Sequence, residues 1–183
     1  MILSAAVILM GLTAFSQTED KKITKTAHIN FFSHTLIEDI SSDNYAVVSS
    51  ITTSTGEVVF SVPMQSFKFE KSMMQKHFNN ADFLDTKQFP KAKFKGKITS
   101  LTSINFEKDG TYNVTFEGEM TIHGVTKAVI EKGKIQVKDK VTTLDLKIKV
   151  LLADYEIALK KGKPSTNVAK EIDVTIKAEY KSI

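Results

Sequence analysis

The sequence predicts an all-β protein, an antiparallel barrel of about eight strands with one short helix. Apolar and charged residues alternate with a period of two along most of the chain, which is typical of strands with one dry and one wet face. Short turn signals join these runs, and no strand–helix alternation supports a parallel sheet. Glycine stands inside two of the runs, at Gly96 and Gly118, which favours strong curvature and therefore a barrel over a sandwich.

The clearest alternation lies in the second half of the chain. Residues 91–98 read KAKFKGKI, so the lysines share one face while Ala92, Phe94 and Gly96 share the other. The same pattern returns at 112–120, 144–152 and 172–180. Successive side chains of a strand point to opposite faces, so the lysines are predicted to be solvated and the apolar residues to face a dry interior.

Three turn signals divide the runs into hairpins. They are Ser54-Thr55-Gly56, Asp109-Gly110 and Lys138-Asp139-Lys140. Each is short enough to join neighbouring antiparallel strands.

The stretch KFEKSMMQKHFNNADF, residues 68–83, is the one convincing helix downstream of the amino-terminal segment. Met73, Met74, His77 and Phe78 form a narrow apolar face, and Asn79-Asn80 is a plausible end. Such a short helix is not stable alone and must pack on the rest of the molecule.

Residues 1–16 are predicted to be a signal peptide, which leaves a single domain at 17–183. The run 2–15 is nearly all apolar or small, shorter than the roughly 20 residues that span a bilayer, and 14–16 form a small-x-small cleavage pattern. The alternative is a buried amino-terminal helix. A signal peptide predicts a periplasmic or secreted protein, and without cysteine its stability has to come from its hydrophobic core.

Catalytic and metal-binding patterns are missing from the sequence. The four histidines (His28, His34, His77 and His123) lack the spacing of a metal site with nearby carboxylates. No nucleophile motif, phosphate-binding loop or dinucleotide fingerprint occurs. The sequence therefore predicts a protein that is not an enzyme and has no catalytic residues, no metal and no cofactor.

The lysines do not predict a nucleic-acid partner. The formal net charge is only +4, and lysines and aromatic residues fall on opposite faces of the runs, where they cannot grip a phosphate and stack a base together. Whether two copies pair as a homodimer is left open.

Phenylalanine dominates the predicted interior. The chain has 12 Phe and no Trp. The inward positions include Phe60, Phe67, Phe69, Phe94, Tyr112 and Phe116. An eight-stranded barrel either fills itself with side chains or holds one small ligand. Composition leaves both a packed core and an apolar ligand cavity open.

Three segments resemble a known family in their order and spacing: FKFEKSMMQKHFN, DTKQFPKAKFKGKI and FEGEMTIHGVTKAV. Phe89, Pro90, Ala92 and Phe94 fit an aromatic–Pro-x-x-x-Phe element, and residues 118–129 fit a second one, with Met120 in place of Leu. Together they resemble the YceI-like family of exported bacterial lipid-binding proteins, in a form similar to that of the Bacteroidetes. The resemblance covers essentially the whole of 17–183.

The resemblance implies an eight-stranded lipocalin-like barrel that binds a long polyisoprenoid, such as an isoprenoid quinone or a polyprenyl phosphate, for transport or storage. It implies no catalytic set. The helix and the loop at 81–89 become candidates for a lid or a plug, and Lys91 for a head-group contact. The alternative is an exported stress or interaction module with a solid barrel. The apolar lining predicted from family and alternation is Phe60, Phe67, Phe69, Met74, Phe78, Phe94, Tyr112, Val114, Phe116, Leu146, Ile148, Val174 and Ile176.

Overall fold

Eight long strands form a closed antiparallel barrel, as the alternation predicts. A computed structural model describes residues 20–36, 38–157, 159–160, 163–164 and 169–182, so the predicted signal peptide lies outside the described residues. The ring strands are β1 (Lys21–His34), β2 (Asp39–Thr52), β3 (Glu57–Pro63), β5 (Lys91–Ile98), β6 (Gly110–Ile122), β7 (Val125–Lys138), β8 (Val141–Leu151) and β11 (Glu171–Ser182).

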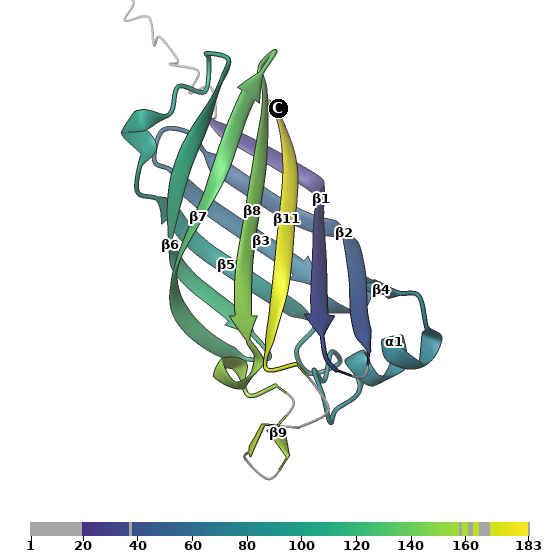
Figure 1. Cartoon of the computed structure of the whole chain (residues 1–183). Coiled ribbons are helices and arrows are strands. Elements are labelled where there is room, and N and C mark those ends of the chain that lie inside the picture. The colour runs from purple at the N-terminus through teal and green to yellow at the C-terminus, as the bar shows by residue number, and fades with distance from the viewer. Residues whose placement is uncertain (1–19, 37, 158, 161–162, 165–168, 183) are drawn as a thin grey trace, which may run out of the picture.

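The strands follow the order β1-β11-β8-β7-β6-β5-β3-β2 around the barrel, and pairing of β1 with β2 closes the ring. The two-residue strand β4 (Lys68–Phe69) adds to the margin of β2, and β9 (Leu159–Lys160) pairs with β10 (Lys163–Pro164) outside the ring. Figure 1 shows an elongated barrel with two different ends. The lower end carries helix α1 (Ser72–Asn79) and is called the α1 end below; the upper end carries the β7–β8 hairpin and is called the hairpin end.

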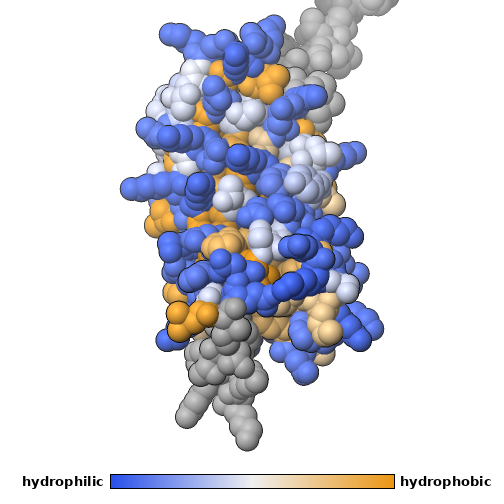
Figure 2. Space-filling view, turned by 45° about the vertical axis from the view of Figure 1, so that its right-hand side comes forward, coloured by the Kyte–Doolittle hydropathy of each residue, from blue (hydrophilic) through white to orange (hydrophobic). Residues whose placement is uncertain are grey.

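The predicted alternation of faces is present along the ring strands. In β8, Leu144, Leu146, Ile148 and Val150 are buried, while the residues between them from Asp145 to Lys149 are exposed. The lysines of β5 are likewise exposed. Hydrophilic side chains stand out from the face of the barrel drawn in Figure 2, with apolar residues between them. The solvated lysines and the dry interior are therefore the two faces of one curved sheet.

A pair of glycines brings β5 and β6 unusually close within the barrel wall. Gly96 and Gly118 are direct register partners. A Cβ at Gly118 would lie 2.4 Å from the carbonyl oxygen of Lys95 and 2.5 Å from the Cα of Gly96, both backbone atoms. Only glycine allows this approach, which is the close contact of backbones that glycine inside a strand often marks. We call this contact the glycine waist.

Two of the predicted hairpin turns are confirmed and one is wrong. Thr52 and Glu57 flank a turn in which Gly56 has a φ of +71°, and Asp139 and Lys140 have positive φ in the β7–β8 turn. The Asp109-Gly110 signal does not join two strands, because residues 99–109 form a longer connection that contains the 3-10 helix η2 (Leu101–Ser103). Phe106 of this connection is buried, so packing onto the barrel overrides the local turn signal.

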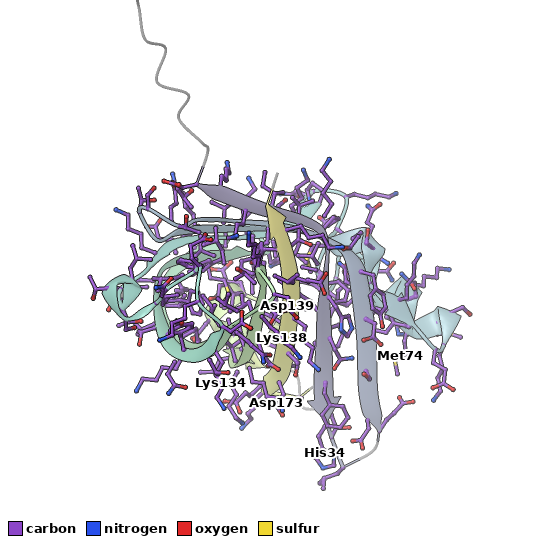
Figure 3. All side chains as sticks on the ribbon, turned by 90° about the horizontal axis from the view of Figure 1, so that it is seen from above. His34, Met74, Lys134, Lys138, Asp139 and Asp173 are labelled. Atoms are coloured by element: carbon purple, nitrogen blue, oxygen red, sulfur yellow. The ribbon has the colours of Figure 1, made fainter. Side chains whose placement is uncertain are left out.

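The predicted helix is confirmed as α1, which ends before Asn80. Phe78 is buried and Met74 half-buried, whereas Met73 is 67% exposed and His77 is also exposed. The helix therefore docks mainly through its carboxyl-terminal turn. In Figure 3, which looks onto one end of the barrel, Met74 lies at the barrel margin on the α1 side. Among the described residues, no helix has the length and apolar character needed to cross a bilayer.

The half of the barrel at the hairpin end is a solid core, called the packed half below. The following inward side chains fill it, all nearly or fully buried: Val47, Ile51, Val58, Val114, Ile135, Val137 and Tyr180. The Tyr180 hydroxyl lies 2.7 Å from the Ser49 hydroxyl, a buried hydrogen bond. Burial raises the pKa of Tyr180, and the bond to Ser49 opposes that rise, so Tyr180 is a neutral phenol that closes this half.

Candidate functional site

The half of the barrel at the α1 end, called the cavity half below, encloses an apolar cavity of about 730 Å³. All eight ring strands contribute inward side chains, and α1 and the loop after it complete the wall. A cavity of about 150 Å³ already holds a benzene molecule, and ligand pockets generally measure about 300–1,000 Å³. The cavity is therefore large enough for an extended apolar chain.

The structure brings most of the predicted lining residues together around this space. Phe60, Phe67, Phe69, Met74, Phe78, Phe94, Phe116, Leu146, Ile148, Val174 and Ile176 all line the cavity. That they contact a ligand stays a prediction.

Tyr112, Val114 and Lys91 lie elsewhere, outside the set of described residues that line the cavity. Val114 faces inward as predicted but belongs to the packed half, and Tyr112 turns its hydroxyl toward the carbonyl of Lys108 at 3.0 Å. Lys91 is exposed at the start of β5, so its suggested contact with a head group stays a prediction. Alternation identified the faces of these strands but not the depth at which the cavity ends.

Four phenylalanine rings pack together where α1 meets the barrel. The ring of Phe78 lies 4.9 Å from that of Phe69, 5.5 Å from that of Phe67 and 5.7 Å from that of Phe31, measured between centroids. All four line the cavity. Offset and tilted ring pairs of this kind add about 0.5–1.5 kcal/mol each to simple burial, so α1 is anchored by the wall that it completes.

Hydrogen bonds fix α1 and the loop that follows it. The Gln75 side chain donates to the carbonyl of Phe67 at 2.7 Å and accepts from the backbone of Phe69 at 3.3 Å. The Thr86 hydroxyl donates to the Asn79 side chain at 2.7 Å, and the side chain of Thr86 is buried. The helix and the loop at 81–89 therefore close this side of the cavity as an ordered wall in the present conformation.

Most polar groups around the cavity cluster at the α1 end. They are contributed by the end of β1, the β1–β2 connection, α1 and the following loop, and they comprise Ser33, Thr35, Glu38, His77, Asn80 and Asp82. Glu38 forms an ion pair with Lys71, and its hydrogen bond and charge raise the pKa of Lys71. The α1 end is thus the wetter end of an otherwise apolar chamber.

Glu131 is an ionisable residue on the inner wall away from that cluster. It occupies an inward position of β7, directly opposite Phe116 of β6, and lines the cavity. Burial raises the pKa of the Glu131 carboxyl above its ordinary value, because a charge loses hydration there. The placement of a carboxyl among aliphatic and aromatic groups is the least expected feature of the site.

Glu131 was not predicted from the sequence, although one signal was available. Counting back by twos from the inward residues Ile135 and Val137 reaches Gly133 and then Glu131. Its neighbour Ile130 is 67% exposed, so hydrophobicity assigns the two residues to the wrong faces. Strict alternation along β7 places Glu131 inside the barrel, whereas its polarity alone predicts an outward position.

Glu131 lies where β7 and β8 separate. Their ladder runs from the Lys138–Val141 pair to the Gly133–Leu146 pair and goes no further, while β7 stays paired with β6 as far as Val125. The 3-10 helix η3 (Leu152–Tyr155) packs against β7. Burial, and then the charges of Asp154 and Glu131, raise the pKa of Tyr155 to about 12. Tyr155 is therefore a neutral phenol whose titration responds to the Glu131 charge.

Metal-binding geometry is absent from the part of the chain that the structure describes. No group of three or more His, Asp or Glu side chains there could hold a metal ion. His28 pairs with Asp43 at 2.6 Å and His34 with Asp39 at 2.5 Å, and both pairs lie on the flanks of β1 and β2, away from the cavity wall.

The sequence from residue 19 to residue 180 matches the family model of the YceI-like domain. The chain belongs to the YceI-like family. The matched region runs from just before β1 to near the end of β11 and so includes the cavity and the packed half.

The two segments that carried the resemblance meet in space. The ring of Phe89, from the Phe-Pro element, lies 4.6 Å from that of His123 in the β6–β7 turn, centroid to centroid. Gly124 follows with a φ of +79°, and a Cβ there would lie 2.6 Å from the Phe89 ring. This YceI-like pattern therefore joins the loop at 81–89 to the β6–β7 turn and fixes the wall of the cavity half.

Curated relatives match this YceI-like chain over part of their length. A UPF0312 protein of Pseudomonas putida is 34% identical over 113 residues, which cover 55% of this chain and 50% of the relative. Protein YceI of Escherichia coli is 33% identical over 110 residues, which cover 57% and 51%. The chain spans about half the length of the curated relatives it matches.

Solved structures resemble the barrel over most of its length. A polyisoprenoid binding domain from Saccharophagus degradans aligns with a TM-score of 0.75 and 12% identity, over 90% of this chain and 99% of that one. Burkholderia cenocepacia BcnA aligns with a TM-score of 0.67 and 14% identity, over 84% and 95%. The YceI protein of Campylobacter jejuni aligns with a TM-score of 0.61 and 18% identity, over 82% and 90%. At these identities the likeness concerns the fold.

Proposed function

We propose that this protein binds a long apolar chain of the polyisoprenoid type in its barrel cavity, and carries or stores it without converting it. The observation that carries the proposal is the cavity of about 730 Å³, which is walled by inward side chains of every ring strand. A barrel that served only as an interaction module would gain stability by filling this space, because unfilled volume forfeits van der Waals contacts.

Burial of an apolar chain is sufficient to drive this binding. Each buried methylene contributes about 0.8 kcal/mol, while association itself costs about 4–15 kcal/mol. A short chain therefore binds weakly, and affinity should rise with chain length until the cavity is full. This dependence suits a ligand made of repeated apolar units, and a carrier is useful because such chains are nearly insoluble in water.

The family and its structural neighbours point to a binding protein rather than an enzyme. The neighbour from Saccharophagus degradans is a polyisoprenoid binding domain. In the described part of this chain the cavity wall is mostly apolar, with most of its polar groups gathered at the α1 end and two further ones, Lys93 of β5 and Glu131 of β7. We place the protein in the periplasm or outside the cell, an assignment supported by the amino-terminal pattern at 1–16.

Lipid extraction and native mass spectrometry of the purified protein test the proposal. We expect a co-purifying lipid or, after delipidation, uptake of prenyl alcohols with an affinity that increases with chain length. A delipidated protein that takes up no prenyl chain of any length would overturn it and favour a module without a ligand.

A matched pair of variants locates the binding. Val174 lines the cavity and Val59 lies on the outward face of β3, so Val174→Phe narrows the cavity while Val59→Phe makes the same substitution outside it. We expect Val174→Phe to lower prenyl binding at least tenfold and Val59→Phe to leave it unchanged. Equal effects in the two variants would place the chain outside the barrel.

A further inference from the structure

Glu131 has no partner for its carboxyl among the described residues. No hydrogen bond or ion pair joins it to any of them, although its charge is felt by Tyr155. Inward positions of the same strand are occupied by Val129 and Ile135, and Phe116 lies directly opposite. Glu131 is half-buried, so its carboxyl loses part of its hydration without gaining a hydrogen bond within the described chain.

Glu131 lies on the cavity wall and does not help to hold the strands of the barrel together. Polar side chains that hold the framework together are paired within the chain, as with Ser49 and Tyr180 or Asn79 and Thr86. Glu131 instead lines the cavity, on the half of β7 that has left its ladder with β8. A polar group of a molecule within the cavity would satisfy the carboxyl there.

The chemistry of a carboxyl in this setting separates two classes of ligand. A hydroxyl can donate a hydrogen bond to the carboxylate, and a ring carbonyl can accept one from the protonated acid. A phosphate would instead bring a second negative charge: two like charges about 4 Å apart repel by about 4 kcal/mol at the effective dielectric constant of a protein surface. An uncharged polar group is therefore favoured next to Glu131, and an anionic one is disfavoured.

We infer that Glu131 is the polar recognition point of the cavity: it binds an uncharged hydroxyl or carbonyl carried on the apolar chain, and it excludes a phosphate from that position. This inference rests on the proposed binding of an apolar chain. It narrows the ligand from polyisoprenoids in general to those with an uncharged hydrogen-bonding group. A polyprenyl phosphate, the other ligand that the family resemblance implies, would leave Glu131 facing either hydrocarbon or an anion.

Three probes that share one prenyl chain test this inference by displacement of a fluorescent apolar dye. They are the prenyl alcohol, the corresponding prenyl phosphate and the matching branched hydrocarbon. In the unchanged protein we expect the alcohol to bind more tightly than the hydrocarbon. Glu131→Leu should lower the preference for alcohol over hydrocarbon at least tenfold, which is the scale of one hydrogen bond to a charged group.

Two further variants keep the test decisive. Glu131→Gln retains hydrogen bonding and removes the charge, so alcohol binding should persist while phosphate binding improves. Glu117→Gln alters an exposed carboxyl on β6 and should change none of the three affinities. If the alcohol-to-hydrocarbon preference is the same in the unchanged protein, Glu131→Gln and Glu131→Leu, the inference is wrong although chain binding stands. If the unchanged protein binds none of the probes, the proposed function itself fails.

Discussion

The packed half and the cavity half of the barrel follow the same alternation of inward and outward residues, yet one is solid and the other hollow. The packed half is filled largely by β-branched side chains, and Val47, Ile51 and Ile135 are fully buried. In the cavity half, phenylalanine rings gather against one another where α1 docks, and the centre stays open. The cavity wall also contains many β-branched residues, so β-branching alone does not decide which half is filled.

Polar groups on the inner face are paired at some positions and unpaired at others. In the packed half Ser49 and Tyr180 satisfy each other, whereas in the cavity half the Glu131 carboxyl has no hydrogen-bond partner among the residues described. In the packed half the buried Thr142 hydroxyl, next to Val137 and Tyr180, also lacks one, and nothing in the structure explains it. A neutral hydroxyl costs far less than a carboxylate to leave unpaired, so Glu131 is the group whose presence calls for a ligand.

The largest expected effect comes from the glycine waist, which lies on the β5–β6 side of the cavity half, between the lining residues Phe116 and Met120. Gly118→Val should lower the free energy of unfolding by at least about 4 kcal/mol, because the new side chain meets the backbone of β5, which cannot move aside without breaking the ladder. Thr115→Val puts the same side chain on an outward position of β6 and is the control, with an expected change under about 1 kcal/mol. Urea unfolding measures both. A mild effect of Gly118→Val would mean that the two strands can separate here.

Most of the fold could be predicted from the sequence because a period of two directly encodes a half-buried strand. The faces of β5, β6, β8 and β11, the helix at 72–79 and the turns at Gly56 and Asp139 follow from local pattern. The Asp109-Gly110 hairpin failed because Phe106 is buried against the barrel, a tertiary contact that no local signal contains.

The cavity was harder to predict than the barrel that holds it. Val114 and Phe116 are both inward, apolar and two residues apart on β6, yet Phe116 lines the cavity and Val114 is packed. That boundary depends on the sizes of side chains from several strands at once. Glu131 was missed for a different reason, since it is a charged residue facing inward beside an apolar one facing outward.

A second prediction compares the same truncation in the two halves. Ile135→Ala opens a new void in the packed half and should lower the free energy of unfolding by about 3–4 kcal/mol. Ile148→Ala enlarges a space that already exists, so only part of the packing is lost and about 1–2 kcal/mol is expected. Chemical denaturation of the delipidated proteins gives both values. Equal losses would mean that the cavity half collapses onto itself when empty.

The smallest effect is a pH dependence that belongs to the cavity half alone. Because burial raises the pKa of Glu131 in the folded protein, folding favours its protonated form, and that contribution to stability is lost as the pH rises above the ordinary glutamate range. Glu131→Gln should therefore have a higher Tm than the unchanged protein at pH 7.5, and the difference should disappear near pH 3, where the carboxyl is protonated in both the folded and unfolded states. Tyr155 stays neutral throughout, since its pKa is about 12, and the exposed Glu117→Gln is the matched control.

Thermal unfolding of the delipidated proteins across this range measures the difference, and a difference in Tm that is constant with pH would show that Glu131 is hydrated like a surface residue. Addition of a prenyl alcohol should then narrow the gap at pH 7.5, because a hydrogen bond from the ligand stabilises the carboxylate that the empty cavity leaves unpaired.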